Sequence, residues 1–315
     1  MCAVFGLIDY GKVFKARQRE KILHSLSLEC EVRGTDAAGY AFNTGGKLKI
    51  SKRPVPASKL WVRLYEAANI ILGHTRMATQ GDKKFNCNNH PFPGKCQNTK
   101  FALAHNGVIY NDSELRKEHK IPQTKVKTDS YIAVQMLEKL GELNAENLAK
   151  VSEEIRGSFV FTVLDEQNNS YFVRGDDPLA LYNFKAGFHI YASTENILEN
   201  ALTALGLAKY PHEKISTICG DILKIDRNGK LSKSYFRSNV MEYLRCYNWD
   251  CYPDYSELNR LKMLAEKNGY FEDCVELLLD YGYSALDIED LICIPEAFEN
   301  AVSEVLCEYG YCNEM

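Results

Sequence analysis

The chain opens with MCAVFGLI (residues 1–8), where the apolar run Ala3–Ile8 predicts a short buried strand. Cys2 stands directly before this run. Its small side chain favours removal of the initiator Met1, which would leave one residue carrying both a thiol and a free α-amine. The α-amine has a reference pKa of about 7.7–8.0, so near neutral pH it can take the proton of the thiol. Cys2 is therefore a candidate nucleophile that carries its own base, and the plainer alternative is a small buried side chain.

Five further motifs follow Cys2 along the chain. They are RGTDAAG (33–39), GHTRMATQG (73–81), NNHP (88–91), HNG (105–107) and TDS (128–130). In order and spacing across residues 2–237, Cys2 and these motifs resemble the class II glutamine amidotransferase domain, a branch of the N-terminal-nucleophile hydrolases. The detailed pattern is most similar to the glutaminase domain of glucosamine-6-phosphate synthase.

The resemblance implies an α+β fold, in which two antiparallel sheets form a four-layer αββα sandwich over residues 1–240. The hydrophobic pattern predicts elements that suit such a fold. Strands are predicted at Ala3–Ile8, Gly39–Phe42, Leu48–Ser51, Ile70–Leu72, Phe101–Ala104, Ser158–Leu164, Ser170–Val173, Phe188–Ala192 and Asp221–Ile225. Helices are predicted at about 16–32, 113–119, 129–140 and 194–206.

The same resemblance implies the chemistry of the site. Cys2 would attack the side-chain amide of L-glutamine to form a thioester, which water resolves to glutamate and ammonia. The side-chain N–H of Asn106 and the backbone N–H of Gly107 would form the oxyanion hole. Arg76 would bind the α-carboxylate, for which its planar fork is well suited, and Asp129 would bind the α-ammonium.

Other interpretations of these residues stay open at this point. Thr79 and His90 occupy matching substrate-pocket positions, but a histidine before proline is equally a structural residue. Arg76 could instead be a surface ion-pair partner, and Asp129 could be no more than a helix cap. The pair 106–107 could be a turn, since Asn-Gly is a common hairpin signal.

The sequence departs from the family pattern at three positions. Ala3 stands where glycine is usual, Met77 replaces a common tryptophan, and Gln80 replaces a common histidine. The last two lie in the glycine-bounded segment 73–81, so the closure of that loop over glutamine is in question. The candidate nucleophile and oxyanion hole are intact. Arg33 and Asp36 are expected to build the neighbouring loop.

Composition excludes several classes of function. The chain has 315 residues with 45% hydrophobic and 25% charged side chains, as in ordinary globular proteins. We expect no membrane span, because no apolar run approaches 18 residues, and no signal peptide. Eleven cysteines without a Cys-x-x-Cys pair indicate reduced thiols and a cytoplasmic location. No metal, cofactor, phosphate-loop or nucleic-acid motif is present, so none of these partners is expected.

Charge changes sign near residue 240. Residues 241–315 carry 17 acidic and 4 basic side chains, a net charge of −13, whereas residues 1–240 carry 25 acidic and 34 basic, a net charge of +9. The tail also holds amphipathic stripes, with a Ser284/Asp287 capping box between two of them. Residues 241–315 are therefore predicted to be an acidic helical extension. One hypothesis makes it a docking element for a partner or a second copy, and the other makes it ordinary core.

Three functions remain. The first is a glutaminase that passes ammonia to a separate acceptor enzyme, since about 75 residues are too few for an acceptor domain. The second is a thiol hydrolase of another small γ-glutamyl amide. The third is a module that binds glutamine as a sensor, although a sensor needs no nucleophile.

Overall fold

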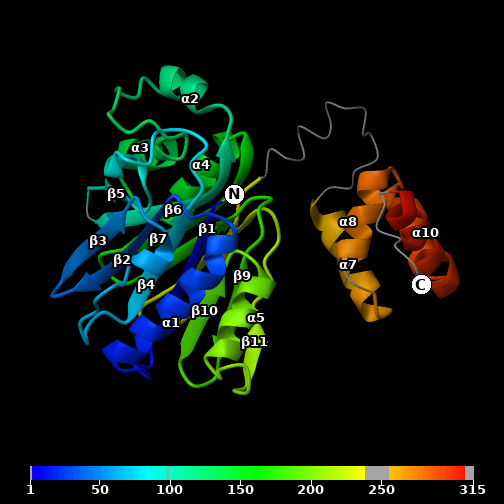
Figure 1. The fold of residues 1–315 in the computed structure, drawn as a ribbon. Helices are drawn as coiled ribbons and strands as arrows, with labels where there is room; N and C mark the ends of the chain where they lie inside the picture. The colour runs from blue at the N-terminus through cyan, green and yellow to red at the C-terminus, as the bar shows by residue number, and fades with distance from the viewer. Residues whose placement is uncertain (1, 98, 238–254, 271, 309–315) are drawn as a thin grey trace. The chain divides into compact units, whose positions relative to one another are not determined.

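A computed structural model describes residues 2–97, 99–237, 255–270 and 272–308 (Figure 1). The chain forms two compact units, Met1–Asn239 and Val240–Met315. They are called the N-terminal unit and the helical unit below, and each is described by itself.

In one sheet of the N-terminal unit, the strand that comes first in the chain lies in the middle of the sheet. The strand order is β11-β9-β10-β1-β4-β2-β3, and all neighbours are antiparallel. The strands are β1 (Ala3–Ile8), β2 (Ala37–Thr44), β3 (Lys47–Arg53), β4 (Ile70–Arg76), β9 (Ala180–Phe184), β10 (Phe188–Ala192) and β11 (His212–Lys214). Because β1 pairs with β4, Ala3 lies opposite Thr75, and Cys2 comes next to the end of β4.

The second sheet has the order β13-β12-β8-β7-β6-β5, again antiparallel throughout. Its strands are β5 (Phe92–Lys95), β6 (Lys100–Ile109), β7 (Gly157–Asp165), β8 (Ser170–Arg174), β12 (Asp221–Ile225) and β13 (Leu231–Tyr235). A hairpin at residues 165–169 joins β7 to β8, where Asp165 accepts hydrogen bonds from the backbone of Gln167 and Asn169.

Alternating side chains of each sheet fill separate cores. Along β1, Phe5 packs with helices α1 (Ala16–Glu29) and α5 (Glu195–Ala204), whereas Val4 packs in the layer between the sheets. Along β6, Leu103 packs with α3 (Tyr131–Leu140) and α4 (Ala145–Glu154), whereas Ala104 faces the other sheet. Figure 1 shows these helix pairs on opposite sides of the sandwich. The predicted αββα architecture is confirmed.

Several element boundaries differ from the sequence-based expectation. Every predicted strand overlaps an observed one, and the predicted helices correspond to α1, α2 (Asp112–Glu118), α3 and α5. However, β6 runs on to Ile109, so residues 105–107 lie inside a strand rather than after it. Helix α3 begins at Tyr131, so Asp129 precedes the helix. The expectation missed α4, β5, β9, β11 and β13.

The helical unit has a core of its own. It comprises α7 (Tyr255–Lys267), α8 (Glu272–Tyr281), α9 (Ala285–Ile292) and α10 (Pro295–Glu308). Side chains from all four helices, such as Leu261, Leu278, Ile288 and Val305, bury one another. The predicted capping box is confirmed, since the side chain of Ser284 accepts from the backbone of Asp287 and the side chain of Asp287 accepts in return.

This core changes the interpretation of the amphipathic stripes. The sequence left open what each stripe packs against, and in the structure the stripes pack against one another. Burial of the stripes therefore gives no argument for docking. The amphipathic stripes predicted from the sequence include Phe271 and Tyr309, and Gly310 is predicted to end the last one; these three residues lie outside the described residues. Among the described residues, no helix is long and apolar enough to cross a membrane.

Candidate active site

The strand pair β1/β4 brings two candidate residues together. Cys2 directly precedes β1, and Arg76 is the last residue of the neighbouring β4. The Cys2 thiol is half-buried and donates to the carbonyl of Met77 at 3.5 Å. Burial raises the pKa of this thiol, whereas the Met77 contact and the nearby Arg76 guanidinium lower it. A thiol in this setting needs a base to become a nucleophile.

Arg76 is buried, with 3% of its surface exposed, yet its charge has no carboxylate partner. Its Nη1 donates to Oδ1 of Asn89 at 2.8 Å, and its Nη2 donates to the carbonyls of Gln80 and, at 2.8 Å, Gly81. All three acceptors are neutral. Within the described ranges, no acidic side chain lies within ion-pair distance of this guanidinium. The surface ion-pair interpretation of Arg76 is therefore wrong.

Asp129 is a second buried charge, with 4% of its surface exposed. One carboxylate oxygen accepts from the backbone N–H of Ile109 at 2.7 Å, and the other accepts from the hydroxyl of Ser130 at 3.3 Å. The carboxylate thus binds an amide of strand β6 instead of capping α3. In the part of the chain that the structure describes, it too forms no ion pair.

The two charges lie in the same neighbourhood as the thiol. Arg76 lowers the pKa of Cys2 and Asp129 raises it. Burial lowers the pKa of Arg76, while the charges of Cys2 and Asp129 raise it. Buried charges in proteins are normally paired, because desolvation is costly. A cation and an anion held apart at one site form a receptor for a ligand that carries both charges.

Strand β6 carries a side-chain amide that forms no hydrogen bond with the described residues. Asn106 is fully buried, and neither its amide nitrogen nor its amide oxygen has a partner within the described residues. Next to it, Gly107 has a φ of 131°, and a Cβ there would lie 2.0 Å from the carbonyl oxygen of Ser158. Only glycine fits this position. The turn interpretation of residues 106–107 is wrong, because both residues pair with β7.

His90 and Thr79 stand apart from these groups. His90 is 3% exposed, and its ring packs in tilted geometry against His74 and Phe92, with centroid distances of 4.2 and 4.3 Å. Burial holds the pKa of His90 well below its usual range, and neither ring nitrogen has a partner among the described residues. This packing favours the structural interpretation. Thr79 is exposed in the segment that follows β4.

Neighbouring side chains hold the site in place. Arg33 donates through Nε to the carbonyl of Cys2 at 2.8 Å. The carboxylate of Asp36 accepts from the backbone of Ala78 at 2.9 Å and pairs with Lys83. These contacts support the loop-building role expected of Arg33 and Asp36. Sequence reasoning missed Asn89, whose only signal was a second asparagine in the motif NNHP.

Comparison with known proteins identifies a family for this chain. Residues 49–214 match the model of the glutamine amidotransferase domain family. The chain belongs to that family, whose domains hydrolyse glutamine to give ammonia for transfer.

Individual relatives are larger proteins. The chain is similar to glutamine–fructose-6-phosphate aminotransferase from Staphylococcus epidermidis, with 30% identity over 202 residues, 61% of this chain and 32% of that protein. The enzyme of the same name from Fusobacterium nucleatum is 30% identical over 254 residues, 78% of this chain and 39% of that protein. The chain thus spans between 32% and 39% of these relatives' length.

A solved structure shows the same fold. Glutamine phosphoribosylpyrophosphate amidotransferase from B. subtilis, complexed with ADP and GMP, aligns with a TM-score of 0.57 and 20% identity. The alignment covers 84% of this chain and 58% of that chain. At this identity the likeness concerns the fold alone.

The unfilled amide of Asn106 leads to a stability prediction. Asn106→Leu replaces an unbonded buried amide by an apolar group of similar size, so the free energy of unfolding should rise by about 1–3 kcal/mol. Asn111 is the matched control, because it is also buried but its amide bonds Glu154 and Arg156, each at 2.9 Å. Asn111→Leu should lower the free energy of unfolding by about 1–3 kcal/mol. Denaturant titration measures both, and equal losses would show that Asn106 is satisfied in solution.

Proposed function

We propose that the N-terminal unit hydrolyses the side-chain amide of L-glutamine to glutamate and ammonia through a thioester on Cys2. One observation carries the proposal: Arg76 and Asp129 are buried, opposite in charge, near Cys2, and without ion-pair partners in the described chain. The head group of an α-amino acid carries the matching pair of charges. Arg76 would bind the α-carboxylate and Asp129 the α-ammonium, each by charge-assisted hydrogen bonds.

The reaction follows from the placement of the remaining groups. After removal of Met1, the α-amine of Cys2 takes the thiol proton, and sulfur forms a bond to the amide carbon. The carbonyl electron pair moves onto oxygen, where the Asn106 side chain and the Gly107 N–H donate to it. Collapse of this intermediate breaks the carbon–nitrogen bond, and the α-ammonium of Cys2 returns its proton to the departing nitrogen, which leaves as ammonia. Water then cleaves the thioester and releases glutamate.

Two alternatives share parts of this site. A thiol hydrolase of another small γ-glutamyl amide would use the same head-group receptor and nucleophile but accept a larger leaving group. A glutamine-sensing module would use the receptor alone. The unbonded amide of Asn106 suits an enzyme, because it can donate to the oxyanion that forms when Cys2 attacks, and a sensor needs no nucleophile such as Cys2.

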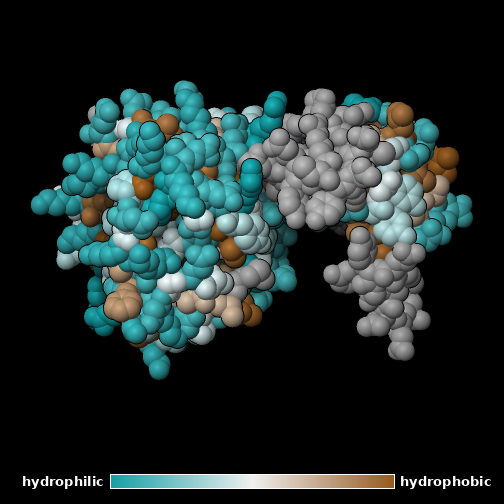
Figure 2. Space-filling model, turned by 90° about the horizontal axis from the view of Figure 1, so that it is seen from above, coloured by the Kyte–Doolittle hydropathy of each residue, from teal (hydrophilic) through white to brown (hydrophobic). Residues whose placement is uncertain are grey.

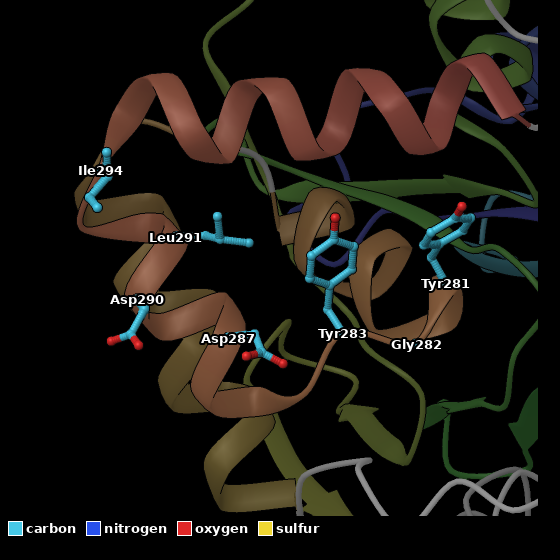
Figure 3. A pocket seen from close by; sticks show the side chains of 7 residues that line it. All are labelled: Tyr281, Gly282, Tyr283, Asp287, Asp290, Leu291 and Ile294. Carbon is cyan, nitrogen blue, oxygen red and sulfur yellow. The ribbon is translucent and has the colours of Figure 1, made fainter.

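The ammonia is proposed to pass to a separate acceptor enzyme that docks on the helical unit. This unit has a surface hollow lined by Tyr281, Gly282, Tyr283, Asp287, Asp290, Leu291 and Ile294. Leu291 extends from α9 toward Tyr283, and Asp287 and Asp290 lie on the same helix as Leu291 (Figure 3). An apolar hollow beside acidic groups suits a partner segment that combines an apolar side chain with lysine or arginine.

The surface of the helical unit supports the docking role. Hydrophobic side chains gather on part of it (Figure 2), and Met263, Leu286 and Ile294 expose 71%, 71% and 58% of their surfaces. Because residues 241–315 carry a net charge of −13, two tails repel each other. A basic partner is therefore favoured over tail-to-tail self-association, and docking should weaken as salt rises.

A cytoplasmic location is part of the same proposal. Cys2, Cys30, Cys87, Cys96, Cys219, Cys274 and Cys293 are free thiols. Free thiols are the ordinary state in a reducing compartment, and the proposed reaction itself requires a reduced Cys2.

Covalent labelling tests the proposed nucleophile. A diazoketone analogue of glutamine should add one equivalent of mass to the N-terminal peptide, with Met1 absent from active protein. Cys2→Ala should abolish both labelling and ammonia release. The buried Cys30, whose pKa burial raises, is the internal control and should stay unlabelled. Labelling at another cysteine, or activity with Met1 in place, would contradict the mechanism, and a panel of γ-glutamyl amides separates the two hydrolase functions.

Truncation tests the role assigned to the tail. A chain ended after Ser238 should remain folded and release ammonia from glutamine with kcat/KM unchanged within about twofold, because the cores of the N-terminal unit consist of its own residues. Sedimentation of the full and shortened chains at low and high salt shows whether the tail mediates self-association. Collapse or aggregation of the shortened chain would make the tail a structural part of the catalytic unit.

A further inference from the structure

Asn89 has an amide whose orientation the surrounding groups fix. The residue is fully buried, and its Nδ2 donates to the carbonyl of Lys83 at 2.8 Å and to Oδ1 of Asn86 at 3.2 Å. Its Oδ1 accepts from Nη1 of Arg76 at 2.8 Å. A guanidinium only donates and a carbonyl only accepts, so the amide cannot be flipped. The oxygen of Asn89 therefore faces Arg76 whatever else is bound.

The environment of Arg76 preserves its charge. Three of the five guanidinium N–H groups are bonded, to Asn89, Gln80 and Gly81, and each acceptor is an uncharged oxygen. Two acidic side chains whose charges act on Arg76 bond elsewhere: Asp36 pairs with Lys83, and Asp82 pairs with Lys84 at 2.8 Å. Neutral groups thus fix the orientation of the guanidinium, and its remaining N–H groups can donate to an anion.

We propose that Asn89 is a positioning residue that sets the preference of this site for substrates bearing an α-carboxylate. Its neutral oxygen orients Arg76 without cancelling the positive charge. The inference rests on the proposed function, because it assigns the α-carboxylate of the substrate to Arg76.

The choice of an amide at this position has a physical reason. A carboxylate at position 89 would form a charge-assisted pair with Arg76, and the substrate would then have to compete with a permanent intramolecular partner. A side chain without an acceptor would leave Nη1 unbonded in a buried place, and the guanidinium would be free to turn. Of these possibilities, only a neutral acceptor both holds the guanidinium and leaves its charge available.

Asn88 provides a matched control in the adjacent position. It is 2% exposed, its Nδ2 donates to the carbonyl of Asp82 at 3.0 Å, and its Oδ1 accepts from the backbone of Lys127 at 2.9 Å. It therefore anchors the same loop with a similar number of bonds, but none of these reaches Arg76. The variant Asn88→Ala therefore measures how loosening this loop affects catalysis when the bond to Arg76 is kept.

The test compares glutamine with 4-aminobutanamide, which lacks only the α-carboxylate. The ratio of their kcat/KM values is measured for the wild-type chain, Asn89→Asp, Asn89→Ala and Asn88→Ala, each checked for folding by thermal unfolding. Asn89→Asp should lower the ratio by about 10- to 100-fold, through a higher KM for glutamine with kcat nearly kept. Asn89→Ala should lower the ratio less, and Asn88→Ala should leave it unchanged.

Other outcomes would overturn the inference. An Asn89→Asp ratio equal to that of the wild type, or equal losses for both substrates, would mean that Asn89 only supports the loop. If the wild-type chain releases no ammonia from glutamine, the proposed function fails. The ratio of the calorimetric affinities for glutamate and 4-aminobutyrate then measures the same preference for an α-carboxylate without turnover. Asn89→Asp must still reduce this ratio. Should Asn89→Asp not fold, Asn89→Ala carries the comparison in both assays.

Discussion

The N-terminal unit keeps two opposite charges buried and apart. Arg76 and Asp129 are each almost fully shielded from water, and each is bonded only to uncharged groups within the described chain. Direct pairing would be the ordinary way to reduce the cost of burial. Here the two side chains are instead held on different elements by neutral partners, and in the proposed function this separation makes room for a zwitterion.

The two sheets carry different residues of the proposed site. The pair β1/β4 places Cys2 beside Arg76, so the proposed nucleophile and the proposed carboxylate receptor lie at the same end of one strand pair. Strand β6 carries Asn106 and Gly107, and two residues further on its Ile109 amide holds Asp129. Strand β6 therefore carries the proposed oxyanion groups and also anchors Asp129, the proposed receptor for the α-ammonium, which itself precedes α3. A ligand bound at both receptors spans the two sheets, which makes their packing part of the site.

Local signals were sufficient to predict much of this fold. Short, largely apolar runs marked β1, β7 and β10, and the motifs in their order indicated the sandwich. Helix α4 was missed because its sequence, AENLAKVSEE, is mostly polar, although Asn144 caps it by accepting from the backbone of Asn147 at 2.8 Å. The strand β6 continues through residues 105–107 because they pair with β7. The sequence alone did not predict this continuation, because Asn-Gly is typical of a turn.

The candidate site was predictable as a set of residues but not as an arrangement. Cys2, Arg76, Asn106, Gly107 and Asp129 came from motif order. Their unfilled hydrogen bonds and unpaired charges depend on contacts between distant segments, which composition and periodicity do not encode. Asn89 is the clearest case, since its bond to Arg76 joins residues 13 positions apart and links a strand end to a loop. The mutual burial of the tail helices was equally invisible, because an amphipathic stripe does not name its partner.

The central claim is that this protein leaves charges unpaired for its substrate to complete, and a crystal structure of the full chain with glutamate bound tests it most directly. The account predicts the α-carboxylate within hydrogen-bonding distance of Arg76, the α-ammonium at Asp129, and the side-chain carboxylate between Cys2 and Asn106. Glutamate bound elsewhere, or an Arg76 and Asp129 that have turned to pair with each other, would contradict it.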